Sequence, residues 1–263
     1  MSIAVVIPSR LAPNSSSAPV AADRALYLDR ALASVQAQTR RDLISQVVVC
    51  VDPGRSREVP ARIALTSFGG LAVEVIEGDT ASQASALNAG IRSVTAGWIA
   101  FLEDDDVWRP ERIETQWEYA GKHDLVTSSQ EEVGENGAHV RIQHFPTPSG
   151  WLLRADGRDS PRFDESFVWH VDTEMLGQLK RANARRVHFA PAEHVGNGLA
   201  WVACSSSIAR NAGAPLVIRT LNTLGGMAQI SRSARAARQS RLEYQEIRRR
   251  YGDLFPATGG VPW

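Results

Sequence analysis

The 263-residue sequence lacks the disulfide and metal-binding patterns that stabilise proteins with a small hydrophobic core. It has only two cysteines, Cys50 and Cys204, and no CxxC motif or Cys/His cluster, which excludes a disulfide framework and a zinc ribbon. Cys50 lies in an apolar run, as expected of a buried small hydrophobic residue. No apolar run approaches the ~18 residues that cross a bilayer. The apolar start of the chain breaks at Pro8 with no basic segment before it, unlike a signal peptide. We therefore expect a soluble cytoplasmic protein.

Two common nucleotide-binding motifs are also absent. No GxGxxG follows the first apolar run and no GxxxxGK[ST] occurs, which argues against NAD-binding and P-loop proteins. Apolar residues make up 43% of the chain and charged residues 22%, which excludes a disordered chain. The net charge is zero, but residues 180–251 carry 13 Lys and Arg against 3 Asp and Glu. The acidic remainder could serve a cation, and the basic part an anion or an acidic partner.

The first 120 residues alternate short apolar runs with amphipathic segments. Strands are expected at 3–7, 46–51, 71–76 and 98–102, and helices at 23–38 (capped by Asp23), 59–67, 82–94 and after Pro110. Because these apolar runs are continuous rather than alternating, they indicate a parallel sheet covered on both faces. The later part is less regular. It predicts a strand at 125–128, loops over 130–165, a helix at 174–184, a strand at 187–190 and a long basic helix at 228–251.

An acidic run, Glu103-Asp104-Asp105-Asp106, follows directly on the apolar run Trp98–Leu102. Such runs are commonly solvated turns that cap a helix, but ligands of open α/β sheets bind beyond the carboxyl ends of the strands. Carboxylates crowded at that edge raise one another's pKa unless a cation lies among them. Oxygen ligands suit Mg²⁺ or Mn²⁺, which bridge substrate phosphates. The run therefore predicts a metal–diphosphate site.

Asp52 ends the strand 46–51 and so lies at the same edge of the sheet. Two interpretations stay open for it. It forms an Asx-turn ahead of Pro53-Gly54, or its carboxylate hydrogen-bonds a ribose or a base.

Five segments follow one another along residues 3–115. They are the strand end Pro8-Ser9, the helix end Gln38-Thr39, VVVCV-Asp52-Pro-Gly, Ala86-Leu-Asn88-Ala-Gly90, and GWIAFLEDDDVWRPERI at 97–113. Together they resemble the nucleotide-binding half of family 2 glycosyltransferases with the GT-A fold. The resemblance implies an α/β fold with a mostly parallel central sheet and flanking helices. It assigns residues 1–115 to nucleotide-sugar binding, 116–215 to an irregular acceptor-binding and catalytic half, and 216–263 to a basic helical extension.

The resemblance also implies roles for individual residues. Glu103 and Asp105 match the first and last positions of the family's DxD motif, which makes them candidate ligands of Mn²⁺ or Mg²⁺. Asp104 would lie against the ribose or a metal-bound water. His194, after the strand 187–190, is a further candidate metal ligand, although a lone histidine is more often structural. The residues expected to line the nucleotide are Pro8, Ser9, Arg10, Asp52, Asn88 and Asp104.

The segment from Arg162 to Glu174 resembles the one that carries the family's catalytic carboxylate. Asp172 matches that aspartate, with Val171 where the family has glutamate; the local alternative is that Asp172 only caps the following helix. Two departures from the family's pattern leave the identity of the nucleotide open. Pro53 replaces an aspartate that reads the base, and Arg10-Leu11 replaces Tyr-Asn.

The function implied is an inverting, metal-dependent hexosyltransferase that moves a sugar from a nucleoside-diphosphate sugar to a hydroxyl of a small molecule, glycan or peptide. The alternatives are a nucleotidyltransferase, or a non-catalytic nucleotide- or glycan-binding domain that docks through its basic helix. The aromatic residues of the acceptor half either stack on sugars or belong to the core; they are Phe145, Trp151 and Trp169.

The predicted basic helix has seven arginines within 232–250. It is compatible with phosphates, an anionic partner or peripheral contact with a membrane, or with a solvated helix whose arginine stems pack down. No nucleic-acid-binding motif occurs, so no nucleic-acid partner is expected.

Overall fold

The computed structural model describes most of the chain. The described residues are 1–9, 20–59, 67–68, 71–120, 124–134, 136–143, 147–155, 161–182, 187–190, 194–195, 198–199, 202–205, 208–210, 215–221 and 234–252. No helix among them is long and apolar enough to cross a membrane.

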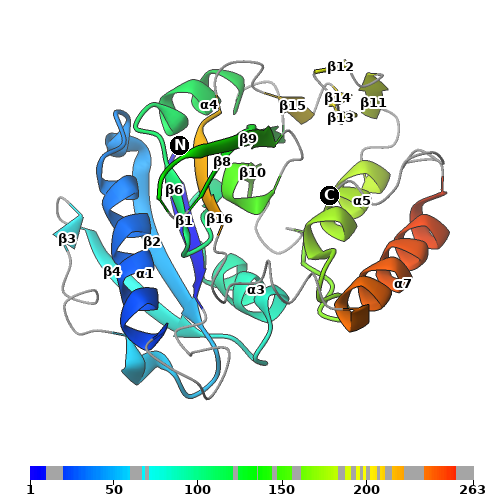
Figure 1. The fold of residues 1–263 in the computed structure, drawn as a ribbon. Coiled ribbons are helices and arrows are strands. Elements are labelled where there is room, and N and C mark those ends of the chain that lie inside the picture. Colours follow the sequence, from blue (N-terminus) through cyan, green and yellow to red (C-terminus); the bar gives the residue numbers. More distant parts are fainter. Residues whose placement is uncertain are drawn as a thin grey trace.

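A central sheet of eight strands, in the order β15-β7-β10-β5-β1-β2-β4-β3, organises the fold (Figure 1). Its four core strands, which run parallel, are β1 (Ile3–Ser9), β2 (Ile44–Val51), β4 (Leu71–Glu77) and β5 (Trp98–Phe101). The flanking strands are β3 (Ser67–Phe68), β7 (Leu125–Thr127), β10 (Leu152–Arg154) and β15 (Ile208–Arg210). The continuous apolar runs are buried on both faces, which confirms the predicted mostly parallel sheet.

Helices cover the two faces of this sheet. On the face of Ile3, Val5 and Ile7 lie α1 (Val20–Gln36) and α4 (Arg112–Ala120). On the face of Val6 lie α3 (Gln83–Ser93), α5 (Val171–Ala182) and α7 (Ala234–Tyr251). Gly90 lets α3 approach the sheet closely, because a Cβ atom there would lie 2.3 Å from Cγ1 of Val6.

A second sheet has the order β6-β16-β8-β9. It consists of β6 (Asp106–Trp108), β16 (Val217–Leu221), β8 (Gln130–Gly134) and β9 (His139–Gln143). The prediction of loops throughout 130–165 was therefore wrong, since β8, β9 and β10 lie there. The sequence of β8 lacks the alternation of apolar and polar residues that indicates a strand. Its polar side chains instead pair with side chains of the neighbouring strands.

The remaining elements are short. Two small sheets pair β11 (Val187–Ala190) with β14 (Val202–Ser205), and β12 (His194–Val195) with β13 (Gly198–Leu199). Three 3₁₀ turns are η1 (Arg41–Leu43), η2 (Ser56–Glu58) and η3 (Pro148–Gly150).

The predicted helices agree with the structure in position more than in their ends. Ser82 caps α3 as expected, its Oγ accepting the N–H of Ser85 at 3.1 Å. Asp23 is not the N-cap of α1, which begins at Val20. Helices α4 and α5 begin at Arg112 and Val171. The helix expected at 59–67 falls mostly outside the described residues, as does the segment 222–233 before α7.

Candidate active site

Three chain segments meet beyond the carboxyl ends of the core strands. Ser9 ends β1, Asp52 follows β2, and the acidic run follows β5. The Ser9 hydroxyl donates a hydrogen bond of 2.5 Å to Oδ2 of Asp104, and Asp52 is buried. The edge predicted from the apolar runs therefore brings Ser9 and Asp104 together.

Glu103, Asp105 and Asp106 form a compact carboxylate group. One oxygen of each lies within 4.8 Å of the others. The run turns tightly, with the N–H of Asp106 donating to the carbonyl of Glu103 at 3.1 Å, and Gln83 of α3 donates to Oε1 of Glu103 at 2.6 Å. The predicted ligands Glu103 and Asp105 are thus adjacent, and Asp106 joins them. Sequence reasoning did not single out Asp106, because the DxD spacing includes only the first three acidic residues of the run.

The environment of Asp106 suits a divalent cation. Its side chain is 1% exposed, and neither carboxylate oxygen accepts a hydrogen bond of normal geometry from the described residues. Burial, with the nearby charges of Asp105 and Glu103, raises its pKa well above the usual range, although Arg219 and the Ser149 hydroxyl oppose this rise. Burial likewise raises the pKa of Glu103. A cation among these oxygens would replace the missing donors and relieve the repulsion. The donor set therefore fits Mg²⁺ or Mn²⁺.

Arg219 on β16 lies beside this carboxylate group, and sequence reasoning missed it. It pairs in register with Asp106 of β6 on one side and with Glu132 of β8 on the other. Burial alone would lower the pKa of Arg219, but the carboxylates of Asp106, Glu103 and Asp105 outweigh this effect, and the pKa lies above its ordinary value. Arg219 is therefore a fixed positive charge in the site. No local pattern reveals it, since the pairing of β16 with β6 joins distant parts of the chain.

Arg219 is one member of a charge row that crosses the second sheet. The row runs Asp106, Arg219, Glu132, Arg141 through successive register pairs. At its outer end, Nε of Arg141 lies 2.5 Å from Oε2 of Glu132, whose side chain is 3% exposed. Opposite charges directly across a sheet attract each other. The row thus holds Arg219 between two buried carboxylates.

Asp172 lies in the first turn of α5 and is buried. Its Oδ1 accepts the N–H of Thr173 at 2.6 Å, and because α5 begins at Val171, Asp172 lies inside the helix and not at its N-cap. Burial raises its pKa to about 7; the Thr173 N–H opposes this, and the charge of Glu103 adds to it. Arg219 acts on Asp172 in the opposite sense to Glu103. The start of α5 therefore faces the acidic group at the end of β5.

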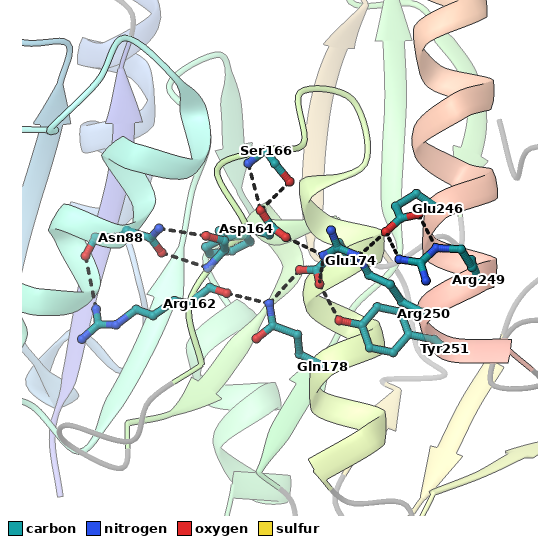
Figure 2. A network of polar contacts seen from close by, with 11 residues as sticks. Asn88, Arg162, Asp164, Ser166, Glu174, Gln178, Glu246, Arg249, Arg250 and Tyr251 are labelled. Atoms are coloured by element: carbon teal, nitrogen blue, oxygen red, sulfur yellow. Dashed lines mark hydrogen bonds and ion pairs between the residues drawn. The ribbon is translucent and has the colours of Figure 1, made fainter.

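Asn88 has a different environment from the one expected of a nucleotide ligand. Its Nδ2 donates to the Phe163 carbonyl at 2.9 Å and to Glu165 at 3.1 Å, while its Oδ1 accepts the Phe163 N–H at 2.9 Å. Figure 2 shows this side chain at one end of a polar network. With its amide hydrogens used in this way, Asn88 links α3 to the segment before α5, and we do not include it in the nucleotide site proposed below.

The other predicted residues are placed as follows. Pro8 is buried within β1, opposite Cys50. Trp151 belongs to the core, stacked on Phe163 with ring centroids 6.2 Å apart, and Trp169 is half-buried. His194 begins β12, but its side chain lies outside the described part of the chain, as do Arg10 and Phe145.

Comparisons with known proteins agree with this geometry. A sequence model described as glycosyl transferase family 2 matches residues 20–180, more than half of the chain. An uncharacterized glycosyltransferase of Nostoc sp. is 34% identical over 105 residues, which are 39% of this chain and 31% of that protein. The chain thus matches less than a third of the length of this curated relative.

Solved structures of S. aureus TarS, residues 1–349, resemble the fold. The complex with UDP gives a TM-score of 0.56 at 13% identity, covering 97% of this chain and 73% of TarS. The complex with UDP-GlcNAc gives a TM-score of 0.50 at 13% identity, covering 97% and 74%. The likeness confirms the GT-A-like α/β fold, and the sequence match identifies this chain as a member of glycosyl transferase family 2.

Proposed function

We propose that this chain transfers a sugar from a nucleoside-diphosphate sugar to a hydroxyl acceptor, with inversion and with Mn²⁺ or Mg²⁺ bound at the acidic run. The observation that carries the proposal is the carboxylate group of Glu103, Asp105 and Asp106, whose oxygens lie within 4.8 Å at the ligand-binding edge of the sheet. Family membership and the UDP complexes of the TarS structures support it.

Asp105, Asp106 and Glu103 would hold the ion, which supplies positive charge against the leaving diphosphate. Arg219 adds a second, permanent positive charge beside it, because its guanidinium stays protonated. Ser9 and Asp104, joined at 2.5 Å, lie on the side of β1 where the nucleoside would bind. Asp52 borders the same edge after β2.

Asp172 is the proposed general base. Its pKa, raised to about 7 by burial, suits proton transfer near neutral pH. It takes the proton of the acceptor hydroxyl while that oxygen bonds to the anomeric carbon. The bond from that carbon to the diphosphate oxygen breaks on the opposite face, so the nucleoside diphosphate leaves and the configuration inverts. This single displacement needs no covalent intermediate on the protein.

A thermal-shift screen of UDP, GDP, dTDP and CDP, with and without Mn²⁺, tests the donor site. We expect a shift for one nucleotide that requires the metal. Asp106→Asn and Asp105→Asn should remove it, whereas Glu118→Gln, which changes an exposed carboxylate of α4, should keep it. Absence of a shift with every nucleotide would overturn the proposal. Nucleotide binding without any turnover, unchanged by Asp172→Asn, would instead identify a binding domain.

A further inference from the structure

Helix α7 binds the backbone of the three residues that precede α5. The Glu243 carboxylate, 5% exposed, accepts the backbone N–H groups of Val168 at 3.2 Å, Trp169 at 2.8 Å and His170 at 3.2 Å. These residues lie directly before Val171, where α5 begins. One side chain of α7 therefore holds the backbone of the turn from which α5 starts.

This arrangement anchors the turn before α5 from a distant helix, and one of the three N–H groups, that of His170, belongs to the residue directly before α5. Backbone N–H groups at a helix start have no partner within the helix and attract negative charge. A capping side chain normally comes from the residues next to the helix. Here the carboxylate comes from a helix more than 70 positions away, with three N–H groups converging on it. The position of the turn therefore depends on the position of α7.

Two neighbours of Glu243 hold His170. The hydroxyl of Ser240 lies 2.8 Å from Nε2 of His170, and the ring of Tyr244 lies 5.7 Å from its ring between centroids. Burial lowers the pKa of His170 to about 4, so the ring is neutral at pH 7. Asp172 follows two positions later in the chain. A shift of this turn would therefore move Asp172 with it.

The far end of α7 is fixed to the same part of the chain (Figure 2). Nη1 of Arg250 lies 2.5 Å from Oδ2 of Asp164, and the Tyr251 hydroxyl donates to the buried carboxylate of Glu174 in α5. Gly177 makes room for the Tyr251 ring, because a Cβ atom there would lie 2.6 Å from Cδ2 of the ring. Contacts at both ends thus set α7 against α5.

We propose that Glu243 is a positioning residue for sugar transfer, which fixes the start of α5 and thereby the orientation and burial of Asp172 toward the carboxylate group of Glu103. The inference rests on the proposed function, since it gives Asp172 the role of base. The groups whose charges act on Asp172 are Glu103 and Arg219, both across the site, and Thr173 beside it acts through hydrogen bonds. Glu243 is therefore expected to act through the backbone of α5.

The test follows the Asp172 carboxyl carbon by ¹³C NMR during a pH titration of the metal-free protein. Wild type should titrate near 7, the value that burial produces. Glu243→Asp keeps the charge but is one methylene too short to reach the three N–H groups. Glu243→Gln keeps the length and one acceptor oxygen, but it removes the charge and replaces the second oxygen with an amide donor. If Glu243 positions α5, both variants hydrate Asp172 and lower its pKa toward the ordinary carboxyl range.

A control variant separates this effect from loss of charge on α7. Glu246→Gln removes the same charge one turn further along, where Glu246 pairs with Arg249 at 2.7 Å and with Arg250 at 2.8 Å. It leaves the three N–H groups bound to Glu243 and the pair of Arg250 with Asp164 in place. It should leave the titration of Asp172 unchanged. A shift in Glu243→Gln alone would show a direct charge effect, and a shift in neither Glu243 variant would show no coupling. Either result overturns the proposal.

Nucleotide binding and turnover separate this inference from the proposed function. In both Glu243 variants, the nucleotide selected by the thermal-shift screen should bind with unchanged affinity. Release of that nucleoside diphosphate from its sugar donor, with water as acceptor, should fall about tenfold to about a hundredfold, as small misplacements of catalytic groups do. Failure of wild type to bind any nucleotide contradicts the proposed function. Unchanged donor hydrolysis in both variants contradicts the role of Glu243.

Discussion

At the scale of single residues, the site depends on a balance of charge between the acidic run and Arg219. Three carboxylates face one guanidinium, and their charges outweigh the cost of burying it. The acidic run was predicted from the sequence, because its position after an apolar strand is a local pattern. Arg219 could not be predicted, since nothing near it in the sequence indicates which strand β16 will join.

We expect Arg219→Gln to change metal and nucleotide binding in opposite directions. Removing a positive charge beside the carboxylates favours Mn²⁺, while it removes an attractive charge for the diphosphate. Each dissociation constant should change about tenfold, or about 1.4 kcal/mol, as measured by isothermal titration calorimetry. Arg141→Gln, at the outer end of the charge row, is the matched control. Weaker Mn²⁺ binding in Arg219→Gln would contradict this assignment.

The titration of Asp172 sets the pH dependence of transfer. A base acts when ionised, and burial raises the pKa of Asp172 to about 7, so the rate should fall as pH drops through the midpoint. Bound metal offsets the charge of Glu103, which places the midpoint no higher than about 7. Asp172→Asn should lower turnover by about 10²–10⁴-fold at every pH and keep nucleotide binding. A rate profile that rises toward acid would exclude this role.

At the scale of elements, the apolar face of α7 matters more than its arginines. The predicted basic helix is present, but its buried side chains pack on α5 or on the turn before it; they are Glu243, Tyr244, Ile247 and Tyr251. Arg238, Arg241, Arg248 and Arg249 are exposed, as in a solvated helix, whereas Arg250 pairs with Asp164. The sequence showed the charge of this helix, but not that its partner is the helix of Asp172.

Gly177→Ala tests the close packing of α5 and α7. Its Cβ atom would lie 2.6 Å from Cδ2 of Tyr251, so the ring of Tyr251 or the two helices must move. Overpacking of this kind costs about 1–3 kcal/mol, measured as the free energy of unfolding in urea. Gly97→Ala is the control, because a Cβ atom there meets nothing within 4 Å. If the two variants had the same free energy of unfolding, the contact between Gly177 and Tyr251 would not be closely packed.

At the scale of the whole molecule, the buried carboxylates of the site lower the stability of the metal-free folded protein. Asp106, Glu103 and Asp172 all have a raised pKa in the folded protein, mainly because burial disfavours their charged forms. The folded state therefore binds more protons than the unfolded state between the ordinary carboxyl range and about 7. Stability should then fall as pH rises through this window.

We expect metal-free protein to melt at a lower temperature at pH 8 than at pH 6. Mn²⁺ should raise the melting temperature more at pH 8, because protons no longer compete for the carboxylates and binding stabilises the folded state by mass action. Differential scanning fluorimetry in EDTA and in Mn²⁺ measures both effects. Asp106→Asn should flatten the pH dependence and abolish the response to Mn²⁺. A metal response that survives in this variant would place the ion elsewhere.

The sequence by itself determined the parallel sheet, its two covered faces and the edge where the acidic run lies. Continuous apolar strands can only be buried on both sides, and the residues after them must meet at one edge. Tertiary structure alone decided that Asp106 joins Glu103 and Asp105, that Arg219 lies among them, that Asn88 bonds to the backbone of Phe163, and that Glu243 binds the turn before α5. Apolar periodicity specifies which face of an element is buried but not which distant element covers it, so contacts between remote segments appear only in the folded chain.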